Sequence, residues 1–373
     1  MATKPGVFAH GRLDSAAALL AAHVRVNAGD VIVAMGCGNG FVPAVFARMG
    51  QAARIVSTDR NIVSVEATKR TLSANGLSAD VIAQHGSFGI VADGSADTVA
   101  IRISHEKLAF VQLLSDALTG LKIGGICYVA GATNEGIKSA AKLLDRAFGN
   151  SVLLGYEGGC RILSATKRSD QPQDATAFES PFVAFDSFRE LNVILRGEPL
   201  VLFSRPGVFS WDHLDEATEV LANNLDVSNG ASVLDLGCGS GPLGIVASRL
   251  SGGGQLTMVD ADVEAVRSAQ KSAETAGVSN FRTLPSDVAG AVLDEKFDIV
   301  VTNPPFHVGK QTELSVPLQF IANSWEVLKP GGMLFLVANR TLPYELAIKE
   351  RFGRVSTIHD GQRFKVLSAT RTK

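Results

Sequence analysis

The stretch Val233-Leu-Asp-Leu-Gly-Cys-Gly-Ser-Gly241 decides the fold, because a short apolar run leads directly into three glycines spaced two residues apart. This pattern is typical of a buried strand that turns sharply into a helix within a parallel sheet. A second version, Val31-Ile-Val-Ala-Met-Gly-Cys-Gly-Asn-Gly40, lies near the start of the chain. The two stretches predict that one fold occurs twice.

An internal repeat supports this prediction. Gly36 and Gly237 are separated by 237 − 36 = 201 residues, and three further pairs share that offset: Asp59 and Asp260, Gly76 and Gly277, Asp97 and Asp298. Lys122-Ile-Gly-Gly125 and Lys329-Pro-Gly-Gly332 are separated by 329 − 122 = 207, which indicates a short insertion in the second copy. A period this long indicates two copies of a domain rather than a solenoid.

Apolar runs alternate with helical patterns in each copy. In the second copy we expect four strands and three helices in alternation, followed by one or two antiparallel edge strands near 354–370. The expected strands are 232–236, 255–259, 297–302 and 333–338, and the expected helices are 243–250, 263–276 and 318–328. Alternation with buried strands predicts an α/β protein with two tandem doubly wound, Rossmann-like domains.

The join between the copies is expected at the polar, proline-containing stretch 168–179. We therefore expect domains at 1–170 and 180–373. After the join, 188–195 and 200–203 flank a turn and predict a β-hairpin without a partner in the first copy. A helix is expected at 215–225.

Composition limits the class of protein. The 373 residues are 46% hydrophobic and 19% charged, which favours a globular chain, and the net charge of −2 does not point to nucleic acid. From Arg340 onward, however, eight Lys/Arg residues face three acidic ones, a balance compatible with a nearby phosphate backbone. Four cysteines without metal spacing, and no membrane-length apolar run or signal peptide, predict a reduced cytoplasmic protein without a metal. The oligomeric state is left open, and a monomer is compatible with the sequence.

The glycine turn of the second copy is a candidate cofactor site. Gly237, Gly239 and Gly241 follow a GxGxG spacing instead of GxGxxG, which argues against a pyrophosphate clamp. Asp235 precedes the glycines, where its carboxylate can pair with an ammonium group.

Polar residues that follow the next two strands complete this candidate site. Asp260, followed by Ala261, ends the second strand in the position suited to ribose hydroxyls. Ser286 and Asp287 follow a further strand, expected between 255–259 and 297–302, at the place where an adenine ring is expected. An amino acid end, a ribose and an adenine without phosphate describe S-adenosylmethionine.

Asn303-Pro304-Pro305-Phe306 is the candidate catalytic segment. It directly follows an expected strand, and two prolines cannot continue a sheet ladder, so a rigid exposed loop is expected. The Asn303 side-chain oxygen and the Pro304 carbonyl can accept hydrogen bonds from a planar amine, and Phe306 can stack on its ring. Methyl transfer mainly needs such positioning, so no general base is required. We interpret the neighbouring His307 as a loop residue.

The first copy lacks these groups. Ala34 stands at the position of Asp235, and Arg102 stands at the position of Asn303, because 303 − 201 = 102. Asp59 and the glycines remain. We interpret the first copy as a duplicate that has lost its chemistry.

The motifs of the second copy resemble those of class I S-adenosylmethionine-dependent methyltransferases of the small-domain type. The resemblance rests on 235–241, on Asn303-Pro-Pro-Phe-His307, on Pro206-Gly-Val-Phe-Ser210, and on the tail segments 337–344 and 361–366. It is closest to the tandem-domain bacterial ribosomal RNA guanine-N2 methyltransferases. The resemblance implies S-adenosylmethionine as cofactor and a guanine N2 amine as target, with 16S small-subunit RNA favoured. It also implies that ribosomal RNA or a ribosomal subunit is the partner, and that the first domain binds RNA or supports the second.

Three other functions remain open from the residues alone. An Asn-Pro-Pro loop also serves protein glutamine-N5 methyltransferases, usually with Tyr at the position of Phe306. DNA adenine or a small molecule presents a comparable amine. A duplicated fold that binds RNA without turnover is disfavoured by the intact Asp235, Asp260 and Asn303.

Overall fold

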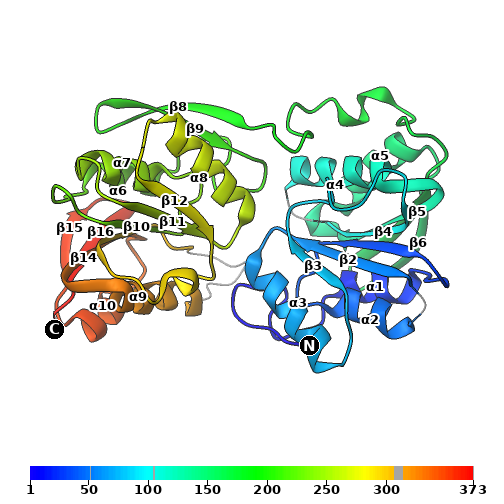
Figure 1. Ribbon diagram of the computed structural model, residues 1–373, viewed down its shortest axis with the longest axis horizontal. Helices are drawn as coiled ribbons and strands as arrows, with labels where there is room; N and C mark the ends of the chain where they lie inside the picture. Colours follow the sequence, from blue (N-terminus) through cyan, green and yellow to red (C-terminus); the bar gives the residue numbers. More distant parts are fainter. Residues whose placement is uncertain (51, 104–105, 306–313, 373) are drawn as a thin grey trace. The chain divides into compact units, whose positions relative to one another are not determined.

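The computed structural model describes residues 1–50, 52–103, 106–305 and 314–372. The chain divides into two compact units, Met1–Ser187 and Phe188–Lys373, and each is described by itself. Both units contain a seven-stranded mixed sheet (Figure 1). Within the described ranges, none of the helices has the length and apolar character needed to cross a membrane.

The N-terminal unit is built on a sheet with strand order β3-β2-β1-β4-β5-β7-β6. The first five strands of this order, β3, β2, β1, β4 and β5, run parallel, and β7 lies between β5 and β6 and is antiparallel to both. Its elements are α1 (Ser15–His23), β1 (Val31–Met35), α2 (Phe41–Met49), β2 (Arg54–Asp59), α3 (Ile62–Ala74), β3 (Asp80–Ala83), β4 (Ala96–Arg102), α4 (Lys107–Gly120), β5 (Leu121–Ala132), η1 (Thr133–Glu135), α5 (Ile137–Phe148), β6 (Val152–Glu157), β7 (Cys160–Thr166) and η2 (Ala175–Phe178).

The C-terminal unit repeats this topology with the order β12-β11-β10-β13-β14-β16-β15. The predicted doubly wound sheet and its antiparallel edge strands are confirmed. Its elements are β8 (Arg189–Leu195), β9 (Glu198–Ser204), α6 (Glu216–Asn223), β10 (Val233–Leu236), α7 (Pro242–Leu250), β11 (Leu256–Asp260), α8 (Val263–Thr275), β12 (Phe281–Pro285), η3 (Gly290–Val292), β13 (Phe297–Thr302), α9 (Ser315–Val327), β14 (Leu328–Asn339), α10 (Tyr344–Phe352), β15 (Ser356–Asp360) and β16 (Phe364–Thr370).

Alternation along buried strands creates the two faces of the C-terminal sheet. Neighbouring side chains of a strand point to opposite faces, so Val233 packs with the core beneath α6, α7 and α8. Leu234 packs with the core beneath α9 and α10. The sheet therefore lies between two helical layers (Figure 1). Strand order reverses between β10 and β13, and ligands of such sheets bind outside the carboxyl ends of the strands at this point.

The predicted hairpin is confirmed as β8 and β9, a separate two-stranded sheet. Arg196 and Gly197 join the strands, both with positive φ (55° and 78°), as a tight two-residue hairpin turn requires. Leu195 and Leu200 are buried against the C-terminal core, so the hairpin belongs to this unit.

The stretch 168–179, predicted as a linker, instead packs on the N-terminal unit. Asp174 pairs with Arg146 of α5 at 2.7 Å, and Ala177 of η2 is buried in the N-terminal core. The contact boundary between the units falls after Ser187. One ion pair and one small apolar residue thus hold part of this polar stretch against the N-terminal unit.

Candidate active site

The glycine turn after β10 leaves space beside the sheet. A Cβ on Gly237 would lie 2.9 Å from the Phe320 ring, and one on Gly241 would lie 3.3 Å from Ala269, so both positions are closely packed. At Gly239, by contrast, no described atom lies within 4 Å of that position. The backbone at Gly239 therefore faces open space, as expected where a ligand approaches.

Asp260, at the end of β11, holds this turn in place. One carboxylate oxygen accepts a hydrogen bond from the Gly239 N–H at 2.9 Å, and the other accepts one from the Asp262 N–H at 2.9 Å. The N-cap of α8 is Asp262. Asp260 thus organises the turn in which Ala261 lies, at the edge where a ribose is predicted.

Asp235 is a buried carboxylate with one open oxygen. Its Oδ2 accepts a hydrogen bond from the Gly244 N–H at 2.8 Å, whereas Oδ1 is buried without a partner among the described residues. Burial raises the pKa of Asp235 to about 7, because the charged form loses its contact with water. An acceptor left open in this way costs about 1–3 kcal/mol, and an ammonium group would satisfy it.

Ser286 and Asp287 lie in the loop after β12. The Ser286 N–H donates to the Asp260 carbonyl at 2.8 Å, and its hydroxyl accepts from the Ala291 N–H at 3.0 Å, so Ser286 ties the loop to the site. Asp287 is partly exposed. Val288 has φ 52°, a conformation that is uncommon for a β-branched residue and that tends to persist at functional sites.

Asn303 follows β13, and its amide group is held from one side. Its Nδ2 donates to Asp215 Oδ2 at 2.9 Å and to Thr218 Oγ1 at 2.9 Å. Its Oδ1 is buried and lacks a hydrogen-bond partner in the part of the chain that the structure describes. Pro304 is buried and Pro305 is exposed. Phe306 and His307 lie outside the described residues.

The structure thus brings most predicted residues to one edge of the C-terminal sheet. They lie at or just after the carboxyl ends of β10, β11, β12 and β13, the edge at which a doubly wound sheet binds ligands.

Sequence reasoning missed Asp215 and Thr218. A signal was available, because Lys4-Pro-Gly-Val-Phe8 and Arg205-Pro-Gly-Val-Phe209 repeat at the same offset, 205 − 4 = 201. Both segments form the same turn, with the Val7 N–H and the Val208 N–H each donating across 3.1 Å to the carbonyl three residues earlier. The offset then aligns Asp215 with Asp14.

The basic tail is largely engaged in contacts within the C-terminal unit. Arg340 pairs with Asp360 at 3.3 Å, Lys365 pairs with Glu345 at 2.5 Å, and Arg363 pairs with Glu216. Other tail cations are exposed, namely Lys349, Arg351 and Arg354. Arg340 and Arg363 are themselves exposed, so their ion pairs partly offset the positive charge of the predicted strip without removing it from the surface.

A family model described as the methyltransferase small domain matches residues 1–164 and 199–368. The chain belongs to the methyltransferase small domain family. The match covers both units of this methyltransferase small domain protein, as the internal repeat predicts, and the resemblance inferred from the motifs is confirmed.

Relatives and a solved structure support the same family. The ribosomal RNA small subunit methyltransferase C of Hahella chejuensis is 33% identical over 280 residues, which is 75% of this chain and 79% of the relative. The protein of that name from Pseudoalteromonas atlantica is 33% identical over 282 residues, 75% of this chain and 78% of the relative. The solved T. thermophilus 16S rRNA N2 G1207 methyltransferase (RsmC), in complex with AdoMet and guanosine, has a TM-score of 0.84 and 29% identity, covering 99% of this chain and 94% of that chain.

In the N-terminal copy of the methyltransferase small domain, the position of Asn303 is occupied by Arg102, whose side chain is bound within its own unit. There, Arg102 pairs with Asp14 at 2.9 Å and with Glu135 at 2.7 Å. Its guanidinium carbon also lies 4.5 Å from the centre of the Phe8 ring. Arg102 is therefore paired within its own unit, whereas Asn303 keeps an acceptor without a donor among the described residues.

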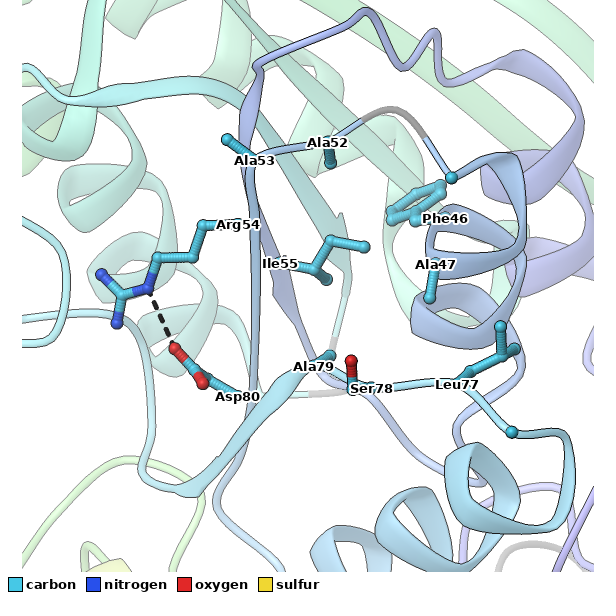
Figure 2. Close-up of a pocket in the computed structure, with 12 residues that line it drawn as sticks. Phe46, Ala47, Ala52, Ala53, Arg54, Ile55, Leu77, Ser78, Ala79 and Asp80 are labelled. Atoms are coloured by element: carbon cyan, nitrogen blue, oxygen red, sulfur yellow. Dashed lines mark hydrogen bonds and ion pairs between the residues drawn. The ribbon is translucent and has the colours of Figure 1, made fainter.

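The N-terminal unit has a separate hollow at the edge of its sheet where the strands begin, opposite the edge that carries its glycine turn. Figure 2 shows Arg54, which begins β2, paired with Asp80, which begins β3, at 2.9 Å. Phe46 and Leu77 line the same hollow. It therefore lies at the amino ends of the strands of this unit. Among the described residues, no cluster of three or more His, Cys, Asp or Glu side chains is arranged to hold a metal.

Proposed function

We propose that this chain transfers a methyl group from S-adenosylmethionine to the exocyclic N2 amine of a guanine in 16S ribosomal RNA. Two small subunit methyltransferase C relatives and a structural neighbour that holds AdoMet and guanosine support this function. The N-terminal unit is proposed to hold RNA or to support the C-terminal unit. The proposed place of action is the cytoplasm.

The observation that carries the proposal is the buried, unpartnered Oδ1 of Asn303. Both hydrogens of its amide point to Asp215 and Thr218, so the oxygen is left as an acceptor without a donor among the described residues. Proteins rarely leave a buried acceptor open, and each exception calls for an explanation. An amine hydrogen of the target base supplies the missing donor.

The residues present also fit the cofactor. The open oxygen of Asp235 suits the ammonium group, the space at Gly239 admits a ligand close to the backbone, and Asp260 lies at the adjacent strand end. When bound, S-adenosylmethionine supplies an electrophilic methyl group on a sulfonium. Asp235, Gly237, Gly239 and Gly241 are the proposed contacts at its amino acid end. Asp260, Ala261, Ser286 and Asp287 are the proposed contacts with its ribose and adenine.

The chain's own contribution to the reaction is orientation. The amine of guanine is a weak nucleophile, because its lone pair is delocalised into the ring. Acceptance of its two hydrogens by Asn303 Oδ1 and the Pro304 carbonyl fixes the amine and orients its lone pair toward the methyl group. The same acceptors stabilise the positive charge that develops as the nitrogen–carbon bond forms. The nitrogen then releases a proton to water, so no general base is required.

The test is to compare ribosomal RNA from cells with and without this protein by mass mapping. The proposal predicts that one N2-methylguanosine of 16S RNA disappears and that the wild-type gene restores it. An unchanged set of 16S methylguanosines would contradict the proposed function. Loss of a methylated glutamine in a protein would instead favour the related reaction on an amide.

A further inference from the structure

We infer that Asp215 and Thr218 are positioning residues for this reaction, because they hold the Asn303 amide in the one orientation that turns its oxygen toward the target amine. The inference rests on the proposed function and deepens it. Neither residue is predicted to touch the cofactor or the base, and both act through Asn303.

The contacts form a closed set around one amide nitrogen. Asn303 Nδ2 lies 2.9 Å from Asp215 Oδ2 and 2.9 Å from Thr218 Oγ1. The same Asp215 oxygen accepts a hydrogen bond from the Thr218 backbone N–H at 2.8 Å, which makes Asp215 the N-cap of α6. The first turn of a helix therefore places both acceptors rigidly against Asn303.

The chemistry of the acceptors determines which end of the amide faces them. An ionised carboxylate can only accept hydrogen bonds, whereas a primary amide has a donating and an accepting end. With the amide reversed, its oxygen would face the Asp215 carboxylate, and its two hydrogens would face the hydrogens of the target amine. Asp215 therefore selects the orientation that leaves Oδ1 open to that amine.

The N-terminal unit shows the same frame used for a different purpose. Asp14 caps α1 through the Ala17 N–H at 2.9 Å, as Asp215 caps α6. It binds Arg102, at the position of Asn303, and Ala17 stands at the position of Thr218. The cap is thus common to both copies, whereas the second acceptor is present in the copy that carries the Asn-Pro-Pro segment.

Asparagine at position 215 separates the two roles of the residue. Asparagine and aspartate cap helices about equally well, so Asp215→Asn keeps the cap and the side-chain volume. Because one oxygen serves both the cap and Asn303, the asparagine oxygen replaces a charged acceptor by a neutral one and weakens the charge-assisted hydrogen bond that selects the orientation of Asn303. A purely structural cap predicts little change, whereas a positioning role predicts slower chemistry.

The experiment measures methyl transfer from S-adenosylmethionine to 16S RNA by the full chain, with cofactor affinity by calorimetry and melting temperature for every variant. We expect Asp215→Asn and Thr218→Val to lower kcat by about 10- to 100-fold, since misplacement of a positioning group commonly costs this much. Cofactor affinity and melting temperature should stay close to wild type. Thr218→Ser should restore most of the rate that Thr218→Val loses.

Two controls make the result decisive. Asp14→Asn is the matched change in the other unit, and it should leave kcat unchanged while lowering the melting temperature, because Asp14 pairs with Arg102. In an Asn303→Ala background, Asp215→Asn should have no further effect on kcat, because a residue that acts through Asn303 has nothing left to position.

The opposing outcomes are distinct. A wild-type rate for Asp215→Asn and Thr218→Val would contradict the positioning role while leaving the proposed function in place. An equal loss of rate in the Asn303→Ala background, or a loss that follows melting temperature, would contradict it as well. A wild-type chain that forms no N2-methylguanosine would overturn both.

Discussion

The two units place different side chains at the same point of one fold, the end of the strand next to the glycine turn. In the N-terminal unit, Arg102 is bonded to Asp14 and Glu135 and lies against Phe8. In the C-terminal unit, Asn303 is held by its nitrogen, and its buried oxygen has no hydrogen-bond partner among the described residues. At this position, the N-terminal unit binds its polar side chain internally, whereas the C-terminal unit leaves one acceptor without a donor among the described residues. The comparison teaches that the frame and the chemistry of a duplicated domain are separable.

The glycine turns show the same separation. Asp59 and Asp260 make equivalent bonds, since the Gly38 N–H donates to Asp59 at 3.0 Å and the Gly239 N–H donates to Asp260 at 2.9 Å. The carboxylate at this position therefore has a structural role in both units. Asp235, however, is replaced by Ala34, which leaves no buried charge at this point of the N-terminal unit.

The loop after the third strand also differs. The Gln84 N–H donates to the Asp59 carbonyl at 3.0 Å, as the Ser286 N–H donates to that of Asp260 at 2.8 Å. The next residue is His85 in the N-terminal unit, buried with Nε2 2.9 Å from the Ala109 carbonyl. In the C-terminal unit it is Asp287, which is partly exposed. A buried core contact in one unit thus corresponds to a partly exposed carboxylate in the other.

The largest effect should come from removing the Arg102 side chain, which should lower the unfolding free energy of the N-terminal unit. Arg102→Ala leaves Asp14 and Glu135 largely buried without their partner, so we expect the N-terminal unit to lose about 3–5 kcal/mol of unfolding free energy. Urea unfolding measures this loss. The exposed pair of Arg54 and Asp80 is the control, and Arg54→Ala should cost less than about 1 kcal/mol. Equal costs for the two variants would show that Arg102 does not close its unit.

Asp235→Asn should sharpen the comparison with Ala34. Without the carboxylate, we expect cofactor affinity to fall about 10- to 100-fold, equivalent to about 1.4–2.7 kcal/mol of binding free energy. Calorimetry at pH 8 measures the change. Unchanged affinity would contradict a contact between Asp235 and the ammonium group.

The same variant has a consequence for pH. The folded-state pKa of Asp235 is raised to about 7, above an unfolded value near 3.9. Between pH 4 and 7 the folded state therefore binds more protons than the unfolded state, and this group lowers the unfolding free energy as pH rises. In the absence of ligand, Asp235→Asn should remove this group's contribution to the pH dependence of the unfolding free energy. Identical slopes would show that Asp235 does not titrate in this range.

The smallest effect on cofactor affinity is expected from Asp260→Ala, with Asp59→Ala as its matched control. Each variant loses two hydrogen bonds to its turn, so both should lower stability by about 1–3 kcal/mol. Cofactor affinity should fall about 10-fold for Asp260→Ala only, as calorimetry can show. Equal affinity in both variants would leave Asp260 with a structural role alone.

Local patterns in the sequence were sufficient to predict most of the fold. The strand 297–302 was predicted with the bounds that β13 has, because an apolar run ending at two prolines has no other interpretation. The antiparallel edge strands and the hairpin followed from the same reasoning. The glycine turn, Asp235, Asp260 and Asn303 were placed at one edge because carboxyl ends of parallel strands meet there.

What the sequence did not show depends on contacts between distant residues. Asp215 and Asn303 are 88 positions apart, and no local pattern connects a helix cap with a strand end. The repeated Pro-Gly-Val-Phe segment could have aligned Asp215 with Asp14, but the identity of its partner required the structure. The φ of Val288 was equally inaccessible, because valine normally avoids that conformation.

The central claim is that methyl transfer depends on the side-chain amide of Asn303 in the C-terminal unit and not on Arg102, which stands at the same position in the N-terminal unit. Single-turnover transfer from labelled S-adenosylmethionine to 16S RNA tests it directly, with Asn303→Ala and Arg102→Ala compared below the melting temperature of both. We predict that Asn303→Ala lowers the rate by about 100- to 1,000-fold with cofactor affinity largely retained, and that Arg102→Ala keeps the wild-type rate. A wild-type rate for Asn303→Ala, or an equal loss in both variants, would contradict the account.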